Sequence, residues 1–300
     1  MSEIDVAYRD AESADLPGGR IVYVRRGSGP PTVLLHGIPL SLLTWRHNID
    51  HLARTATVLA VDLRGFGRSG KPVNADYTVP GHARAIEDLL SRLDLGPVNL
   101  VGSSYGCAVA MTLADVAPAR VSKLVLINPV CYPGGRHSAA RLARIGVLGM
   151  AARSSLRHAA LGKRILASRL RSSYASFTQA TPELVDAYYE LLTREHGEKT
   201  YLATLRCLDE LEVARRVPAL TREALIIWGA QDRVLPVADA QRLDSELPSS
   251  RLEILDGVGH FPQEEVPDRV NRLIASFTDP RRRDETHADV RMDGLGRARS

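Results

Sequence analysis

The sequence of 300 residues predicts an α/β protein in which a mostly parallel sheet is interrupted by a helical insertion. Short apolar runs alternate with segments of helical periodicity, as in strands joined by crossover helices. Most of these runs consist of Val, Leu and Ile without polar alternation, which is typical of strands covered on both faces. Between about residues 133 and 211 the alternation stops, and helical segments follow one another without a convincing strand.

The apolar runs indicate seven strands, of which the earliest are expected to form an antiparallel edge. They are expected at residues 20–25, 32–35, 57–62, 98–102, 123–127, 224–228 and 252–255. Helices fit between them at residues 82–93, 105–117, 237–246 and 267–277. Within the insertion, Thr181 followed by Pro182 predicts a helix start, because threonine caps helices well and proline suits the first helical position.

This pattern divides the chain into four parts. Residues 1–132 and 212–279 are expected to form the two parts of one core domain, and residues 133–211 a helical cap. Residues 280–300 are polar, Arg-rich and without apolar periodicity, so they are expected to form a flexible tail.

The composition is that of an ordinary globular protein, with 44% hydrophobic residues, 25% charged residues and a net charge of +4. The first residues lack the profile of a signal peptide, and no run of about 18 apolar residues could span a bilayer. We therefore expect a cytoplasmic protein without a transmembrane segment. Three scattered cysteines predict neither a disulfide framework nor a metal cluster. We expect no metal, no cofactor and no nucleic-acid partner, while the oligomeric state is left open.

The pentapeptide Gly102-Ser103-Ser104-Tyr105-Gly106 lies where a predicted strand passes into a predicted helix. A serine at such a sharp turn is held in a strained backbone conformation, and small neighbours are needed for the chain to pass. Its hydroxyl then stands at a helix N-terminus, which favours developing negative charge. Ser104 is therefore the candidate nucleophile.

A serine hydroxyl becomes a good nucleophile only when a base takes its proton and an acid orients that base. Asp232 closely follows the apolar run at 224–228, and His260 closely follows the run at 252–255. The carboxyl ends of parallel strands meet at one edge of a sheet, where ligands of open α/β folds bind. We therefore expect Ser104, Asp232 and His260 to lie together as nucleophile, acid and base.

Other residues near these positions are expected to have structural roles. Asp256 precedes a Gly-Val-Gly loop and favours a surface or loop-stabilising role, whereas Asn128 places an amide at the alternative position of the acid. Ser103 cannot occupy the same turn position as its neighbour. His36, which precedes a glycine in the turn after 32–35, is expected to stabilise that turn.

A developing oxyanion needs backbone donors that are already in position. The N–H of Tyr105, directly after the nucleophile, is one expected donor. The N–H of Ile38, in the turn after the strand at 32–35, is the other.

Together these motifs resemble the α/β-hydrolase fold superfamily, over nearly the whole chain except the cap and the tail. The resemblance implies an eight-stranded, mostly parallel sheet with helices on both faces, and a helical cap. Besides the Ser104 pentapeptide it rests on His36-Gly-Ile-Pro39, Asp62-Leu-Arg-Gly-Phe-Gly-Arg-Ser-Gly-Lys-Pro72, Trp228-Gly-Ala-Gln-Asp232 and Gly259-His-Phe-Pro-Gln-Glu-Glu265. Within it, Asp62 and Arg64 are structural loop residues.

The turn at His36 and the histidine loop are most similar to the epoxide hydrolase and haloalkane dehalogenase branch. Members of that branch carry an aspartate at the nucleophile turn, where it attacks by ester formation. Because Ser104 stands there in this chain, the sequence implies acyl-transfer chemistry instead.

The leading hypothesis is a serine hydrolase that cleaves an ester, thioester, lactone or related acyl bond of a small molecule through an acyl-enzyme on Ser104. A carbon–carbon bond hydrolase is an open alternative. So is a non-hydrolytic synthase or cyclase, in which a dry pocket lets an internal nucleophile replace water. A non-catalytic ligand-binding protein is a third alternative, which the complete set of nucleophile, acid and base disfavours.

Residues 134–180 contain no Asp or Glu, but many basic residues. These are Arg136, Arg141, Arg144, Arg153, Arg157, Lys163, Arg164, Arg169 and Arg171. The simplest interpretation is a solvated basic face. The alternative is an electrostatic landing surface for an anionic partner, such as a substrate carboxylate, a coenzyme A ester, an acyl carrier protein or an anionic lipid.

Overall fold

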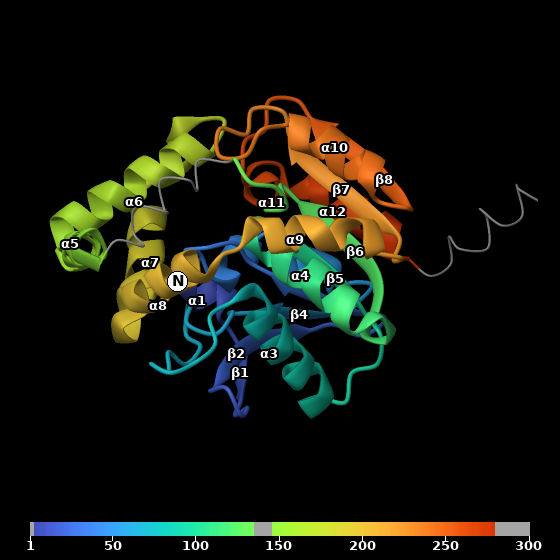
Figure 1. Cartoon of the computed structure of the whole chain (residues 1–300), viewed down its shortest axis with the longest axis horizontal. Helices are drawn as coiled ribbons and strands as arrows, with labels where there is room; N and C mark the ends of the chain where they lie inside the picture. The colour runs from blue at the N-terminus through green and yellow to red at the C-terminus, as the bar shows by residue number, and fades with distance from the viewer. Residues whose placement is uncertain (1–2, 135–145, 280–300) are drawn as a thin grey trace, which may run out of the picture.

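The computed structural model describes residues 3–134 and 146–279 and contains an eight-stranded sheet (Figure 1). The strands are β1 (Ala11–Ala14), β2 (Ile21–Arg26), β3 (Pro31–Leu35), β4 (Thr57–Val61), β5 (Val98–Ser103), β6 (Val121–Ile127), β7 (Ala224–Gly229) and β8 (Ser250–Leu255). They lie in the order β1-β2-β4-β3-β5-β6-β7-β8. The pairs β1–β2 and β2–β4 are antiparallel and the other five are parallel. The predicted mostly parallel sheet with an antiparallel edge is confirmed.

Helices cover both faces of the sheet, because successive residues of a strand point to opposite sides. Val33 and Leu35 of β3 belong to one apolar cluster, and Leu34 between them belongs to the other. The first cluster includes residues of α3 (Val79–Arg92), α4 (Tyr105–Val116) and α10 (Ala238–Glu246). The second includes residues of α1 (Glu3–Ala7), α2 (Ile49–Leu52) and α12 (Pro267–Thr278). Each central strand is therefore buried on both sides, as its unbroken apolar sequence predicts.

Two differences from the prediction have local causes. The strand β1 was not predicted, because its sequence Ala-Glu-Ser-Ala is short and mostly exposed and carries no apolar signal. Helix α3 begins at Val79 rather than residue 82, because the Thr78 hydroxyl accepts a hydrogen bond from the Gly81 N–H and caps the first turn.

In its described part, the interval between β6 and β7 contains helices and no strand. The helices are α5 (Gly146–Arg157), α6 (Ala159–Ser173), α7 (Pro182–Thr193), α8 (Gly197–Cys207) and α9 (Glu210–Arg216). Thr181 caps α7 as expected, by accepting a hydrogen bond from the Leu184 N–H. Figure 1 shows α5 to α8 at one side of the molecule, whereas α9 packs against α4. The proposed cap boundary at residue 211 therefore falls within a helix that packs on the core, and the division into domains stays a prediction.

Within the described residues, no helix combines the length and the apolar character that crossing a membrane requires. The predicted flexible tail at 280–300 lies outside the described residues, as do Arg136, Arg141 and Arg144.

Candidate active site

Ser104 occupies the sharp turn between β5 and α4. Its backbone lies at φ 54° and ψ −115°, a strained conformation for a residue with a side chain. Glycine is needed on both sides of the turn. A Cβ at Gly102 would lie 2.6 Å from the backbone nitrogen of Cys107, and a Cβ at Gly106 would lie 2.2 Å from the carbonyl oxygen of Leu35. The predicted strand–serine–helix arrangement is therefore present.

His260 and Asp232 extend from Ser104 as a chain of two hydrogen bonds. His260 Nε2 lies 3.1 Å from Ser104 Oγ, and His260 Nδ1 lies 2.7 Å from Asp232 Oδ2. The side chains of His260 and Asp232 are only 4% and 0% exposed, so water does not compete for these bonds. Because Asp232 follows β7 and His260 follows β8, all three residues come from the carboxyl edge of the sheet. The structure brings together the three residues singled out from the sequence.

The charge of Asp232 determines which ring nitrogen of His260 carries a proton. Burial opposes ionisation of the carboxyl, but the adjacent imidazole of His260 and the hydrogen bonds outweigh it and hold the pKa of Asp232 below its usual value. An ionised carboxylate can only accept hydrogen bonds, so Nδ1 of His260 carries the proton between them. Nε2 of the neutral ring is then left as an acceptor that faces the Ser104 hydroxyl. In this arrangement an imidazole can take a proton from a serine.

Asn128 takes part in the site through Asp232, a contact that was not predicted from the sequence. It follows β6 directly, and its Nδ2 donates a hydrogen bond of 2.5 Å to Asp232 Oδ2. Its Oδ1 accepts a hydrogen bond from the Gly229 N–H at 3.2 Å, which orients the amide. The N–H groups of Val234 and Leu235 donate to the other carboxylate oxygen. The position of Asn128 at the end of the neighbouring strand was a signal that could have indicated this contact.

The expected oxyanion donors are Ile38 and Tyr105, and both lie near the serine. Ile38 lines the same cavity as Ser104, and a Cβ added to the preceding Gly37 would lie 2.9 Å from the Ser104 Cβ. Tyr105 is the first residue of α4, so its N–H has no acceptor within the helix. Both residues expected to supply the backbone donors therefore lie beside the nucleophile, and their role as donors stays a prediction.

His36, Ser103 and Asp256 lie outside the chain of hydrogen bonds from Ser104 to Asp232. His36 is fully buried; its Nδ1 lies 2.8 Å from the Gly37 carbonyl oxygen, and its Nε2 accepts from the Leu63 N–H. Burial lowers the pKa of His36 to about 4, so the ring stays neutral and joins two loops. Ser103 is buried and accepts a hydrogen bond from the Gln263 side chain, and Asp256 is exposed.

The histidine loop is fastened to the C-terminal end of α6. The N–H of His260 donates to the Ser173 carbonyl oxygen at 2.7 Å. The carboxylate of Glu265 accepts hydrogen bonds from the N–H groups of Ala175, Gly259 and Phe261. One side chain therefore holds both the loop that carries His260 and the residues that follow α6.

A second buried carboxylate, Glu264, links the helical insertion to the core. It lies in α11 (Pro262–Glu265) and accepts hydrogen bonds from the hydroxyls of Tyr174 and Tyr188, at 3.0 and 2.8 Å. On the core side it binds the Thr44 hydroxyl and forms an ion pair with Arg46. The sequence carries no signal for this role of Glu264 and Tyr174, because the contacts join positions far apart in the chain.

A cavity of about 320 Å³ lies in front of Ser104. Its walls come from the turn after β3, from α6, and from the loops around His260 and Val234. The residues that line it are Ile38, Pro39, Leu40, Ser104, Leu166, Ser168, Arg169, Leu170, Ser172, Ser173, Val234, His260 and Phe261. The lining mixes apolar side chains with serines, and Arg169 is the one cation among these residues. Within residues 3–134 and 146–279, no group of three or more His, Cys, Asp or Glu side chains could hold a metal ion.

Comparison with known proteins gives a family model, described as the alpha/beta hydrolase fold, that matches residues 30–267. Haloalkane dehalogenase 2 of Mycobacterium tuberculosis is 30% identical over 272 residues, which cover 87% of this chain and 92% of that protein. The 2-hydroxy-6-oxononadienedioate/2-hydroxy-6-oxononatrienedioate hydrolase of Escherichia coli is 28% identical over 272 residues, which cover 86% and 90%.

Among solved structures, a meta-cleavage product hydrolase from Pseudomonas fluorescens IP01 is similar with a TM-score of 0.77. The superposition covers 89% of this chain and 96% of that one, at 23% sequence identity. At this identity the likeness shows a shared fold.

Proposed function

Because the chain belongs to the alpha/beta hydrolase fold family, in the branch of haloalkane dehalogenases and epoxide hydrolases, we propose that it is a serine hydrolase that cleaves an acyl bond through an acyl-enzyme on Ser104. The observation that carries the proposal is the hydrogen-bonded chain from Ser104 Oγ through His260 to Asp232. Substrates of the proposed class are esters, thioesters and lactones of small molecules.

In the proposed reaction, Ser104 Oγ attacks the carbonyl carbon of the substrate while His260 Nε2 takes the hydroxyl proton. The carbonyl oxygen becomes an oxyanion, and the N–H groups of Ile38 and Tyr105 stabilise it. Collapse of the tetrahedral intermediate breaks the bond to the leaving group, which receives the proton from His260. Water then attacks the acyl-enzyme with His260 as base, which releases the acid and restores Ser104.

Asp232 keeps the imidazole in the tautomer with a proton on Nδ1 and stabilises the imidazolium that forms during each step. The ionised state of this carboxyl, which its lowered pKa favours, supports that role. We also propose that α5 to α8 form a cap over the nucleophile, because α6 contributes Leu166 and Leu170 to the cavity in front of Ser104.

Ser104 argues against dehalogenation and epoxide hydrolysis, because the resemblance to that branch implies an aspartate at this position. Hydrolysis of a carbon–carbon bond is the second candidate. The relative from Escherichia coli, a hydrolase of a 2-hydroxy-6-oxo dienedioate by its name, favours it.

Labelling with a fluorophosphonate, which reacts with activated serines, tests the nucleophile. We expect one phosphonyl adduct on the folded wild-type protein, and mass spectrometry of the digest should find it on the peptide that contains Ser104. Ser104→Ala should abolish the adduct, while Ser103→Ala, the matched control at the neighbouring position, should keep it. Absence of labelling in folded wild-type protein, or an adduct that survives Ser104→Ala, would overturn the proposal.

The bond that is cleaved needs a separate measurement. Esters and thioesters of different chain lengths should give a rapid burst of the released alcohol or thiol if an acyl-enzyme accumulates, and lactones should be opened to the hydroxy acid. Turnover of a 2-hydroxy-6-oxo dienoate, with all of the acyl substrates inert, would favour the carbon–carbon bond hydrolase instead.

A further inference from the structure

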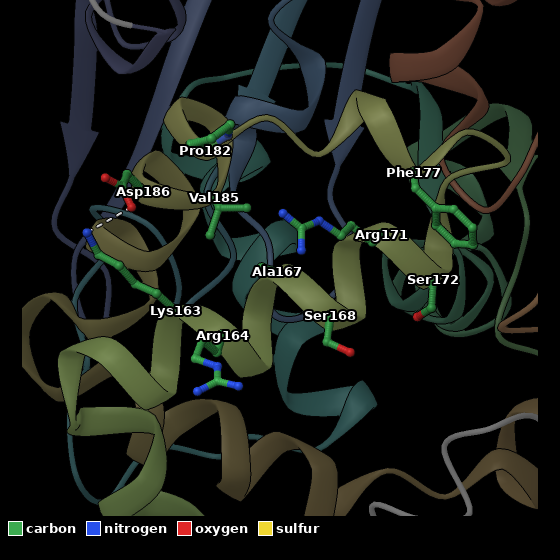
Figure 2. A pocket seen from close by; sticks show the side chains of 10 residues that line it. All are labelled: Lys163, Arg164, Ala167, Ser168, Arg171, Ser172, Phe177, Pro182, Val185 and Asp186. Carbon is green, nitrogen blue, oxygen red and sulfur yellow. Dashed lines mark ion pairs between the residues drawn. The ribbon is translucent and has the colours of Figure 1, made fainter.

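A second hollow lies against α6, next to the Ser104 cavity. It has a volume of about 670 Å³ and is bounded by α6, α7 and the segment between them (Figure 2). Ser104 and His260 do not line it. The larger hollow therefore has no role in the proposed reaction. It nevertheless lies against α6, the helix that also forms a wall of the Ser104 cavity.

The two hollows share lining residues on α6. Ser168 and Ser172 line both of them. These serines are four residues apart and therefore neighbours on one face of the helix. Leu166 and Leu170 face the Ser104 cavity, while Ala167 and Arg171 face the larger hollow. A ligand that crosses the helix at the two serines can occupy both spaces.

The placement of α6 beside the nucleophile is part of the fold. The C-terminal residue of the helix, Ser173, accepts the hydrogen bond from the His260 N–H, and Glu265 binds the N–H of Ala175. Tyr174, directly after the helix, is bound to the buried Glu264. The edge between the hollows is therefore held in place relative to Ser104.

The larger hollow combines an apolar surface with positive charge. Ala167, Pro182 and Val185 provide apolar contacts, and Phe177 at one end is 59% exposed. Lys163 pairs with Asp186 at 2.8 Å, the ion pair drawn in Figure 2.

Arg164 and Arg171 are the unpaired cations of this hollow. Both are exposed, and no carboxylate of the described chain pairs with either one. Figure 2 shows the Arg171 side chain extending from α6 on the side of Val185. The hollow therefore fits a ligand with an apolar body and a negative charge.

We propose that the hollow between α6 and α7 binds the far end of the substrate, and that this end is an apolar chain that carries an anionic group. This inference rests on the proposed function and specifies its substrate class: an acyl compound with the scissile carbonyl at Ser104 and the anion near Arg164 and Arg171. The size of the Ser104 cavity supports it, because 320 Å³ is near the lower limit of the roughly 300–1,000 Å³ of ordinary ligand pockets. A longer substrate has to continue beyond that cavity, and the edge at Ser168 and Ser172 leads to the larger hollow.

The test compares the rates at which two fluorophosphonates label Ser104. One carries a long alkyl chain, and the other carries the same chain with a carboxylate at its end. We expect the carboxylate probe to label the wild-type protein faster. Arg171→Gln and Arg164→Gln should each slow the carboxylate probe by about two- to fivefold, the effect of one exposed charge pair, and leave the neutral probe unchanged. Arg54→Gln, at an exposed arginine outside the helical insertion, is the matched control and should change neither rate.

A further variant tests the passage itself. Ser168→Trp places a large side chain at the exposed edge between the hollows. It should slow both long-chain probes more than a short-chain fluorophosphonate, which stays within the Ser104 cavity that Ser168 also lines.

The outcomes separate this inference from the proposed function. Equal labelling by both long probes, or arginine variants that slow both probes alike, would overturn the inference and leave Ser104 as the nucleophile. An effect of Ser168→Trp on the short probe as large as on the long ones would also overturn it. Absence of labelling by all of the probes would overturn the proposed function, and this inference with it.

Discussion

The loops that follow β4 and β7 each bury an aspartate, and the two carboxylates have opposite properties. Asp62 follows β4 and accepts hydrogen bonds from the Tyr8 hydroxyl and the N–H groups of Leu42 and Arg68. Burial dominates there and raises the pKa of Asp62 to about 6, although the hydrogen bonds oppose it. Asp232 follows β7 and is as deeply buried, but its contact with His260 holds its pKa below the usual value.

Burial at a strand end therefore does not by itself make an acid functional. Asp62 binds three separate segments through neutral donors, so its contacts join loops. A Cβ at Gly67 would lie 2.2 Å from its carboxylate, which shows how closely the loop wraps around it. Asp232 binds an imidazole that itself reaches Ser104. The partner of each carboxylate therefore determines what it can do.

The largest expected effect is on activity. Asp232→Asn should lower kcat by about 10⁴-fold, because an amide can donate to Nδ1 and then holds the imidazole in the tautomer with a proton on Nε2. Steady-state hydrolysis of an ester that the wild-type protein cleaves measures this. Asp62→Asn is the matched control and should retain kcat per folded molecule. A comparable loss in both variants would remove the distinction between the two aspartates.

The next effect is on the pH dependence of stability. The pKa of Asp62 is about 6 in the folded state, above its usual 3.8, so between these pH values the folded chain holds a proton that the unfolded chain has lost. The free energy of unfolding should therefore fall by about 2 kcal/mol as pH rises from about 4 to about 6. Asp232 has the opposite sign, because a lowered pKa contributes stability that disappears only as pH falls below the usual value of an aspartate.

Urea unfolding of the wild-type protein and Asp62→Asn across this pH range measures the Asp62 contribution. The variant should lack the decline between the two pH values. If both proteins show the same slope, Asp62 does not titrate in that window.

A smaller effect is expected on stability at constant pH. At pH 7, Asp62→Asn should lower the free energy of unfolding by about 1–3 kcal/mol, because an amide group cannot satisfy all three buried donors. The midpoint and slope of urea unfolding at that pH provide the measurement. A variant as stable as the wild-type protein would contradict the loop-joining role of Asp62.

The smallest expected effect concerns the neighbour of Asp232. Asn128 has a φ of 43°, so Asn128→Gly removes the side chain without imposing a new backbone strain. Loss of its hydrogen bond should lower kcat by about tenfold and raise the pKa of Asp232. The acid limb of the kcat/KM profile should then move to higher pH. An unchanged profile would show that Asn128 does not stabilise the ionised carboxyl.

Much of the candidate site could be predicted because its residues stand next to strong local signals. Unbroken apolar runs marked the central strands, and Ser104, Asp232 and His260 each follow one of them closely. Their role in catalysis stays a prediction that the labelling and kinetic experiments test. The contacts of Asn128 and Glu264 could not be predicted in the same way, because their partners lie in distant segments that carry no shared pattern.

The order of apolar and polar residues is enough to indicate which residues stand at the carboxyl ends of buried strands, because an apolar run must be covered and the polar residues after it must lie in a loop. Which of the two buried aspartates contacts the imidazole depends instead on how the strands are arranged in the folded sheet. The sheet order places β7 between β6 and β8, so Asp232 lies beside both Asn128 and His260, whereas β4 lies between β2 and β3. The positions of the basic residues of α6 also depend on the tertiary structure. Packing of this helix against the histidine loop sets which of its sides faces Ser104 and which faces the larger hollow.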